Sequence, residues 1–270
     1  MKNVIRPKRS LGQHFLTSDT VPKWMCETAK LSKKDLVLEI GPGTGVLTEE
    51  ILKRAGKVLA IETDPESVSL LNVKFSDEIK NGKLTLVHSD IRDFDINDTI
   101  FYGSDYKIVA NIPYYMSGWL FRRFLTDRHQ PSSLVFLVQK EVAKRICCNL
   151  SKGEKESLLS ISVKAYGQPY YTKTVSRQYF KPKPKVDSGI VLIKNISKDN
   201  FYKYSETDFF SLVRLGFSKK RKQLVTNLTT VYDKSIVLEA LNKAGLSPNT
   251  RAEDVSLDKW FSLYAFLHRV

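Results

Sequence analysis

The chain of 270 residues has few cysteines and no long apolar run. Its three cysteines, Cys26, Cys147 and Cys148, offer no framework of paired disulfides. The longest apolar runs, such as residues 134–138, are far too short to cross a bilayer. The basic segment 1–16 has no apolar core of signal-peptide length. We therefore expect a protein of the reducing cytoplasm that has no membrane partner.

Histidine is also scarce, which argues against a metal centre. No Cys-x-x-Cys pair occurs, and the four histidines are scattered along the chain as His14, His88, His129 and His268. We expect no metal site. The adjacent cysteines are expected to pack on the helix that continues from residues 139–146 rather than to act as reactive thiols.

Positive charge is in clear excess. The chain has 43 lysines and arginines against 29 acidic residues, a formal net charge of +14. Basic residues cluster at 6–9, 181–185 and 219–222. Such a surface attracts polyanions and releases their counterions, which favours a nucleic-acid partner. A solvated basic surface that only aids solubility is the alternative, and composition alone leaves both open.

Short apolar runs alternate with amphipathic stretches up to about residue 195. This pattern is typical of strands separated by crossover helices. The runs are nearly continuous in apolar residues, as expected for strands that are covered on both faces. We predict strands at 35–40, 57–62, 83–90, 107–112 and 133–139, helices at 47–54 and 65–75, and two further strands at 170–180 and 188–194 that form an antiparallel pair closing one edge of the sheet.

After Asn200 the pattern becomes wholly helical. Ser205, three residues before Asp208, is a helix-start signal, and Gly245 is placed as helix ends often are. Three amphipathic helices are predicted at 205–217, 235–246 and 256–267. The predicted fold class is therefore α/β, with a Rossmann-like domain over residues 1–200 and a small all-helical domain over residues 201–270.

A glycine-rich turn, GPGTG at 41–45, joins the strand 35–40 to a helix. Its glycines let the backbone approach a ligand, and the turn presents free N–H groups to it. Glu62 ends the next strand, where an acid that holds ribose hydroxyls belongs. Glu39 completes E-x-G-x-G-x-G, which is typical of S-adenosylmethionine (AdoMet) enzymes, whereas NAD enzymes use G-x-G-x-x-G. A purely structural turn is the alternative.

Two further polar residues end consecutive predicted strands. Asp90 could accept a hydrogen bond from the amino group of the cofactor's adenine, or it could simply cap a helix. Asn111 ends the fourth strand. Ligands bind at the carboxyl edge of an open α/β sheet, so these positions together predict one site.

The segment Asn-Ile-Pro-Tyr, 111–114, suits a target amino group on an aromatic ring. Such a nitrogen is a poor nucleophile, and the Asn111 side-chain oxygen and the Ile112 carbonyl could take its two hydrogens. Pro113 fixes the turn, and Tyr114 can stack on the base. Positioning then drives an in-line displacement, and the base must be unpaired or flipped out. A strand end with a buried tyrosine is the alternative.

Five segments of the chain together resemble the ribosomal RNA adenine N6,N6-dimethyltransferases. They are LGQHFL (11–16), LEIGPGTGVLT (38–48), NIPYYMS (111–117), QKEVAKRI (139–146) and FKPKPKVDSGIV (180–191). Two later segments, FSKKRKQLVTNL (217–228) and RAEDVSLDKW (251–260), are similar to the bacterial small-subunit (16S) members of that family. The resemblance runs from about residue 6 to the end of the chain.

The resemblance implies an AdoMet-dependent methyltransferase domain followed by a helical rRNA-binding domain. It implies N6,N6-dimethylation of two adjacent adenosines in the hairpin near the 3′ end of 16S rRNA, with four methyl groups transferred in all. The partner would be rRNA within an immature small ribosomal subunit, and the activity would belong to small-subunit biogenesis. We expect the protein to act as a cytoplasmic monomer.

The resemblance also implies roles for individual residues. The cofactor would be bound by His14, Leu16, Gly41, Glu62, Asp90 and Asn111. The target adenine would be addressed by Asn111, Tyr114 and Phe180. Contacts to RNA are expected from Lys181, Lys183, Lys185, Lys219, Lys220, Arg221 and Lys222. The chain departs from the family pattern at Tyr115, Met116, Gly118 and Trp119, so the resemblance does not define the substrate entrance.

Three alternatives remain at this point. The first is a macrolide-resistance-type methyltransferase of large-subunit (23S) rRNA, which also carries N-I-P-Y; the tail 251–260 and segment 139–146 favour the small-subunit enzyme. The second is a catalytically silent ribosome-assembly factor on the same fold, against which the intact motif residues argue. The third is an NAD oxidoreductase, which the glycine spacing disfavours.

Overall fold

The computed structural model describes residues 7–8, 12–96, 99 and 101–268. The chain forms two compact units. The sheet unit comprises Met1–Ala143 and Pro169–Ile196, and the helical unit comprises Lys144–Gln168 and Ser197–Val270. Residues 144–168 thus group with the C-terminal helices, although the sequence boundary near residue 200 had placed them with the α/β domain. The functional division at residue 200 stays a prediction.

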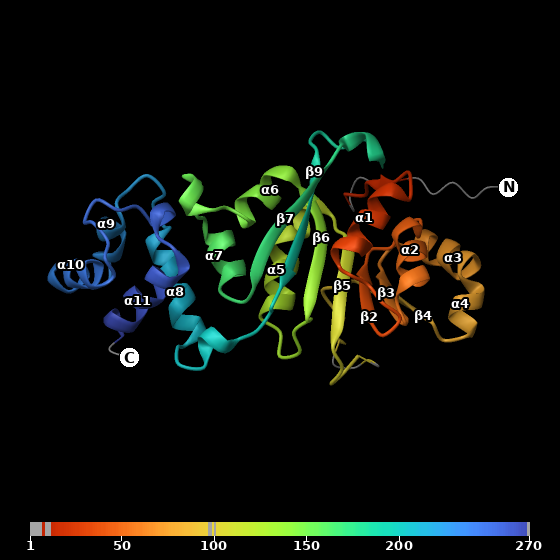
Figure 1. Cartoon of the computed structure of the whole chain (residues 1–270), viewed down its shortest axis with the longest axis horizontal. Coiled ribbons are helices and arrows are strands. Elements are labelled where there is room, and N and C mark those ends of the chain that lie inside the picture. Colours follow the sequence, from red (N-terminus) through yellow and green to blue (C-terminus); the bar gives the residue numbers. More distant parts are fainter. Residues whose placement is uncertain (1–6, 9–11, 97–98, 100, 269–270) are drawn as a thin grey trace. The chain divides into compact units, whose positions relative to one another are not determined.

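The sheet unit is built on one seven-stranded sheet with the order β4-β3-β2-β5-β6-β9-β7 (Figure 1). Its strands are β2 (Leu36–Ile40), β3 (Lys57–Glu62), β4 (Leu84–His88), β5 (Tyr106–Asn111), β6 (Ser133–Gln139), β7 (Gln168–Val175) and β9 (Ser188–Lys194). The strands β2 to β6 are parallel, and β9 runs antiparallel to β6. The five predicted parallel strands are confirmed, and β7 and β9 close one edge as expected.

Helices α2 to α5 lie between strands of the main sheet, and α1 precedes its first strand, β2. Their residue ranges are α1 (Thr20–Thr28), α2 (Val46–Arg54), α3 (Pro65–Lys74), α4 (Ser76–Lys80) and α5 (Ser117–Leu125). The helix α3 begins where Asp64 accepts a hydrogen bond from the Glu66 N–H and proline occupies the first turn. The predicted helices at 47–54 and 65–75 are confirmed.

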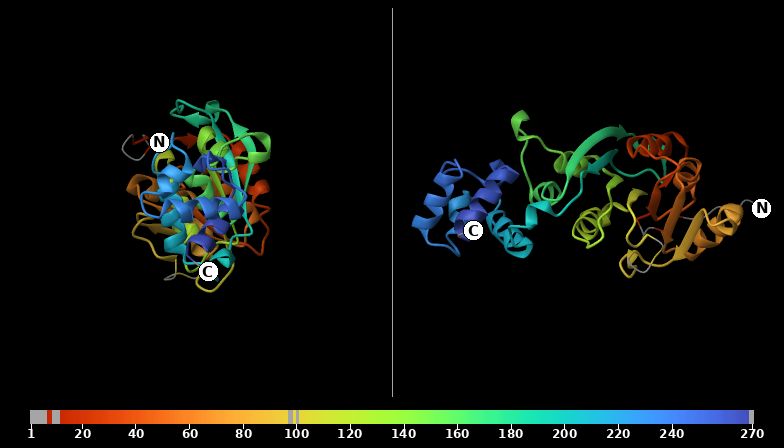
Figure 2. Two further views of the ribbon diagram at one scale, coloured as in Figure 1. Left: turned by 90° about the vertical axis from the view of Figure 1, so that its left-hand side faces the viewer. Right: turned by 60° about the horizontal axis from the view of Figure 1, so that its bottom comes forward.

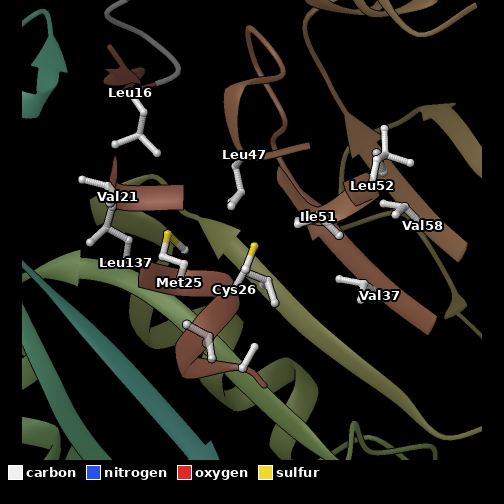
Figure 3. Packing of buried hydrophobic residues seen from close by; sticks show 14 of the residues in the cluster. Leu16, Val21, Met25, Cys26, Val37, Leu47, Ile51, Leu52, Val58 and Leu137 are labelled. Atoms are coloured by element: carbon white, nitrogen blue, oxygen red, sulfur yellow. The ribbon is translucent and has the colours of Figure 1, made fainter. Parts of the chain in front are cut away.

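Side chains of alternate strand residues pack on opposite faces of the sheet. On one face, Met25 and Cys26 of α1 and Ile51 of α2 belong to one cluster of buried residues with Val37 and Val58 of the strands (Figure 3). On the other face, the rings of Phe121 and Phe136 meet at 5.1 Å. Burial on both faces explains why these strands are almost continuously apolar in sequence.

The predicted strand 170–180 is broken into three pieces. β7 ends at Val175, and the Ser176 hydroxyl accepts a hydrogen bond from the Gln178 N–H to start the 3₁₀ turn η5 (Arg177–Tyr179). The strand β8 (Phe180–Lys181) then leaves the main sheet and pairs antiparallel with β1 (Phe15–Leu16). This small ribbon brings two distant segments of the chain together.

The helical unit contains α7 (Leu158–Lys164), α8 (Glu206–Gly216), α9 (Leu224–Leu228), α10 (Lys234–Lys243) and α11 (Leu257–Leu267) (Figure 2). The three predicted C-terminal helices are confirmed. Ser205 caps α8 by accepting from the Asp208 N–H. The Phe209 and Phe261 rings stack at 4.2 Å and join α8 to α11. Trp260 is fully buried.

The cysteines 147 and 148 lie outside a helix, so the helical placement predicted for them is wrong. The helix α6 (Lys140–Ile146) ends one residue before Cys147. Lys164 of α7 holds this segment in place. Its Nζ donates to the Cys148 carbonyl at 2.7 Å and to the Glu156 carboxylate at 2.5 Å. Burial raises the pKa of the Cys147 thiol to about 12.

Helices in the described part of the chain are short. The longest, α8 and α11, have 11 residues each. Over the residues that the structure describes, no helix combines the length and apolar character needed to span a bilayer.

Candidate active site

A cavity opens at the carboxyl edge of the sheet, where the strand order reverses between β2 and β5. Parallel pairing aligns the ends of β2 and β3 at Ile40 and Ile61. Six of the predicted residues line this one cavity: His14, Gly41, Glu62, Asp90, Asn111 and Tyr114. Positions up to 100 residues apart in the sequence are therefore brought together as expected for one ligand site.

The glycine-rich loop has a left-handed backbone that only glycine adopts without strain. Gly41 has φ of +66° and Gly43 has φ of +56°. A Cβ at Gly41 would extend into open space, whereas a Cβ at Gly43 would come within 2.8 Å of the Phe15 ring. Gly43 is thus required for Phe15 to lie against the loop, and Gly41 leaves room for a ligand.

Glu62 fastens this loop to β3. Its Oε2 accepts from the Gly43 N–H at 2.8 Å, and its Oε1 accepts from the Asp64 N–H at 2.9 Å. Only 3% of the residue is exposed. Burial raises the pKa of Glu62, while these two backbone hydrogen bonds act in the opposite direction. Each oxygen keeps a further lone pair, so the carboxylate could still accept hydrogen bonds from ribose hydroxyls.

Glu39 lies on the neighbouring strand and is 1% exposed. Neither of its carboxyl oxygens has a hydrogen-bond partner among the described residues. Burial raises the pKa of Glu39 to about 8, against a smaller lowering by the nearby Thr48 hydroxyl. A buried polar group without a partner indicates a missing ligand or water. The orphaned carboxyl and the open space at Gly41 fit a cofactor with a cationic end, such as the ammonium of AdoMet.

Asp90 is held by its neighbour Arg92. Its Oδ1 accepts from the Arg92 backbone N–H at 2.9 Å and from Nε at 3.0 Å, and Oδ2 accepts from the guanidinium at 2.6 Å. These bonds to Arg92 hold the pKa of Asp90 below its ordinary value. Residues 91–93 form a turn and not a helix, so the helix-cap alternative is wrong. A contact of Asp90 with adenine stays a prediction.

On the target side of the cavity, the Asn111 side chain has a defined orientation. Its Nδ2 donates to the His14 carbonyl at 3.1 Å. No described residue donates to its Oδ1, which leaves that oxygen as an available acceptor at the cavity wall. The Ser117 hydroxyl donates to the Tyr114 carbonyl at 2.8 Å and fixes the turn after Asn111.

Tyr114 is held at both ends of its side chain. The ring stacks on His14 with centroids 5.5 Å apart, and the hydroxyl lies 2.7 Å from the Ser188 Oγ. His14 in turn donates from Nδ1 to the Pro182 carbonyl at 2.8 Å. The loop that follows β8 therefore lies at the site, and its lysines Lys181, Lys183 and Lys185 are exposed.

Two predicted residues do not line the main cavity. Phe180 is 2% exposed and belongs to the core, and Leu16 is its partner in the β1–β8 ribbon. Leu16 instead lines a small second cavity with Glu39 and Asn111. Phe180 is not among the described residues at either cavity. Its stacking on a target base stays a prediction.

Several site residues were missed from the sequence. Gln13, Thr63 and Arg92 line the cavity, and Lys8 lies 2.6 Å from the buried Asp64 carboxylate. Of these residues, only Arg92 could have been found from the sequence, because it lies two residues after Asp90 and can pair with it. Arg6, Arg9 and Leu11 of the basic arm lie outside the described residues.

The remaining predicted RNA-binding residues belong to the helical unit. Lys219, Lys220, Arg221 and Lys222 are exposed in the turn between α8 and α9 and do not extend a helix face. Over the described residues, no group of three histidine, cysteine or acidic side chains is arranged to hold a metal ion.

Two solved structures, each of an enzyme named as a methyltransferase or dimethyladenosine transferase, are similar to this chain over nearly its whole length. The 23S rRNA methyltransferase ErmE is 25% identical, with a TM-score of 0.76 over 94% of this chain and 99% of that chain. A dimethyladenosine transferase from Plasmodium falciparum is 27% identical, with a TM-score of 0.76 over 95% of this chain and 98% of that chain. The likeness confirms the Rossmann-like fold class.

Sequence relatives are closer. The ribosomal RNA small subunit methyltransferase A of Dehalococcoides mccartyi strain BAV1 is 40% identical over 96% of this chain and 88% of its own length. That of Fusobacterium nucleatum is 36% identical over 95% of this chain and 96% of its own length. The family model for ribosomal RNA adenine dimethylase matches residues 4–269. The chain therefore belongs to the ribosomal RNA adenine dimethylase family and is an AdoMet-dependent methyltransferase.

Proposed function

We propose that the protein dimethylates N6 of two adjacent adenosines near the 3′ end of 16S rRNA, acting as a monomer on an immature small ribosomal subunit. Its relatives at 35–40% identity named small subunit methyltransferase A support this target. The observation that carries the chemistry is the unengaged Oδ1 of Asn111 at the wall of the cavity, beside the glycine-rich loop.

The cofactor half of the cavity would bind AdoMet, which supplies a methyl group activated by its sulfonium. The residues proposed to hold it are His14, Leu16, Gly41, Glu62, Asp90 and Asn111. Glu62 has lone pairs left for ribose hydroxyls, and Gly41 leaves open space above the loop. At the small second cavity, on the other side of Gly41, Glu39 has a buried carboxyl that lacks a partner among the described residues, and this carboxyl suits a cation.

The target half would hold the adenine amino group. Asn111 Oδ1 and the Ile112 carbonyl accept its two hydrogens and direct the nitrogen lone pair at the methyl group. Tyr114 stacks on the base, with its ring already oriented by His14 and Ser188. Because Phe180 is buried here, its proposed stacking on the second face requires the β1–β8 ribbon to shift. Positioning supplies the rate, and the base enters flipped out of its helix.

Two basic surfaces would grip the RNA backbone. Lys181, Lys183 and Lys185 are exposed on the loop that bonds to His14. The second surface is the turn 219–222 in the helical unit. Replacing all four residues of that turn with alanine should weaken rRNA binding and flatten its dependence on salt, because fewer counterions are released. An unchanged slope of log Kd against log salt would contradict a role for this turn.

Transfer of labelled methyl to two substrates tests the proposed function. One is small subunits that lack the dimethyladenosines, and the other is protein-free large-subunit rRNA. Label in the small subunit supports the proposal. Label only in the large-subunit RNA would assign the 23S activity named for ErmE, whose fold match equals that of the dimethyladenosine transferase. No label in either, with AdoMet still bound, would indicate a silent assembly factor.

A further inference from the structure

Two aromatic side chains on the segment that leaves the cavity are exposed to solvent. Tyr115 is 65% exposed even though it lines the cavity, and Trp119 of α5 is 38% exposed. Isolated exposed aromatics are ordinary, but Tyr115 lines a ligand site and Trp119 lies only four residues further along the same segment. Their position relative to the cavity therefore needs a reason beyond packing.

Backbone geometry places both residues on one side of a continuous helical segment. The 3₁₀ turn η3 (Tyr114–Met116) passes directly into α5, because Met116 and Ser117 both have right-handed helical backbone. Residues four apart share a face of such a segment. The opposite face is the buried one, formed by Ser117, Leu120, Phe121, Phe124 and Leu125.

The exposed face of this helical segment has free space beside it and carries the positive charge of Arg122. A Cβ at Gly12 would lie 3.2 Å from the Tyr115 ring, so that ring rests against the chain. A Cβ at Gly118, the residue before Trp119, would meet nothing within 4 Å. Arg122, three residues after Trp119, is exposed and forms no ion pair with any described residue. We call Tyr115, Trp119 and Arg122 the entrance stripe.

We propose that the entrance stripe binds the unpaired nucleotides next to the target adenosine, with bases on Tyr115 and Trp119 and a phosphate at Arg122. This rests on the proposed function. Single-stranded RNA is recognised by aromatic rings that stack on bases and by cations that follow the backbone. The stripe has both in order, and it begins at the cavity that would admit the target base. Its charge also complements RNA.

The stripe would matter most for a substrate with two adjacent targets. While one adenosine is flipped into the cavity, its neighbour loses the base on which it was stacked. A ring at the entrance replaces that stacking and lowers the cost of flipping. Trp119 is therefore a positioning residue for the RNA, whereas it does not line the cofactor cavity.

The decisive variant is Trp119→Leu, assayed with small subunits that lack the dimethyladenosines. We expect the KM for subunits to rise about 10-fold, within the range found when a base–aromatic stack is removed. The dissociation constant for AdoMet and the melting temperature should stay unchanged. Trp119→Phe should restore KM to within about 3-fold, because a phenyl ring can still stack.

Tyr102→Leu is the matched control. Tyr102 is 68% exposed, but it lies just before the amino end of β5, at the sheet edge away from the cavity. Its loss should leave KM for subunits unchanged. Equal KM values for Trp119→Leu and the wild type would overturn the proposal, as would an equal rise in Tyr102→Leu.

Tryptophan emission gives a readout that does not need catalysis. The difference between wild type and Trp119→Phe isolates Trp119 from Trp24 and Trp260. An oligoadenosine RNA that stacks on Trp119 should quench this difference signal. If the wild type methylates no rRNA but the quenching occurs, the proposed function is wrong and the proposed RNA binding by the entrance stripe is supported. If methylation occurs and the difference signal does not respond to RNA, the stripe fails and the function stands.

Discussion

The cofactor side and the target side of the cavity differ in how far their polar groups are already engaged. Glu62 accepts two backbone hydrogen bonds, and Asp90 is held by Arg92. On the target side, Asn111 donates its amide to His14 and keeps its acceptor free, and Tyr115 is exposed. The carboxylates on the cofactor side are therefore already fixed by hydrogen bonds within the protein, whereas the target side keeps an acceptor that is free to bind a ligand.

This difference predicts that mutations on the two sides of the cavity will affect different properties of the protein. A residue on the cofactor side supports both the local fold and the ligand, so its loss should lower stability and AdoMet affinity together. An open acceptor on the target side supports only the reaction. Its loss should lower methyl transfer and leave folding unchanged.

Asn111→Ala should have the largest effect. Without the Oδ1 acceptor the adenine nitrogen is no longer oriented, and we expect methyl transfer at saturating AdoMet to fall about 1,000-fold. Label incorporated into unmodified small subunits measures it. The melting temperature and the AdoMet dissociation constant should change far less than methyl transfer, through loss of the Nδ2 bond to the His14 carbonyl and of the cofactor contact proposed for Asn111. A rate of methyl transfer within tenfold of the wild-type rate would contradict the role assigned to the target side.

Glu62→Gln should impair binding and folding together. Both oxygens of Glu62 accept from N–H groups, so an amide must direct its NH₂ at the Gly43 or the Asp64 N–H. We expect the free energy of unfolding to fall by about 1–3 kcal/mol and AdoMet affinity to fall about 30-fold. Calorimetry and urea unfolding measure the two effects. Glu49→Gln, at a half-exposed glutamate of α2, is the control.

Weaker AdoMet binding by Glu62→Gln with full stability would show that the cofactor side is not built as described. Methyl transfer should recover when AdoMet is raised to saturate the variant, since the target side is intact.

Glu39→Gln should stabilise the ligand-free protein, and increasingly so as pH rises. The folded pKa of Glu39, about 8, lies above the ordinary value near 4.5. The unfolded chain therefore releases this proton first, and the wild type loses stability between pH 5 and pH 8. Glutamine removes that loss. We expect a difference of about 2 kcal/mol at pH 8 that shrinks towards pH 5. A difference independent of pH in urea unfolding would contradict burial as the cause.

Tyr114→Phe should have the smallest effect. It removes the hydrogen bond to Ser188 but keeps the ring that would stack on the base. We expect a loss of about 1 kcal/mol in unfolding free energy and about a threefold fall in kcat/KM. A fall as large as that of Asn111→Ala would instead assign the hydroxyl a part in the chemistry.

Much of the sheet could be predicted from the sequence. The strands 57–62, 133–139 and 188–194 have the predicted bounds because their burial on both faces produces long apolar runs between turn signals. Gly41, Glu62, Asp90 and Asn111 could be predicted because parallel strands end at one edge of the sheet, whereas the place of His14 rested on the family resemblance alone.

Other features depend on contacts that leave no local pattern. The β1–β8 ribbon pairs two strands of two residues each, too short for any periodicity. Phe180, which the resemblance places at the target adenine, is buried where its strand pairs with that of Leu16. Residues 144–168 group with the C-terminal helices through bonds such as that from the Glu156 N–H to the Glu253 carbonyl, which no short window of sequence reveals.

The β1–β8 ribbon also sets a time at which the enzyme can become active during its own synthesis. His14 and Pro182, which meet at the site, are separated by 168 positions. At about 5–20 residues per second, roughly 10–30 s of translation lie between them. The segment around His14 is therefore synthesised long before the segment around Pro182. Contacts between residues so far apart in sequence form late in folding. A nascent chain still attached to a ribosome has no complete site until most of its length has emerged.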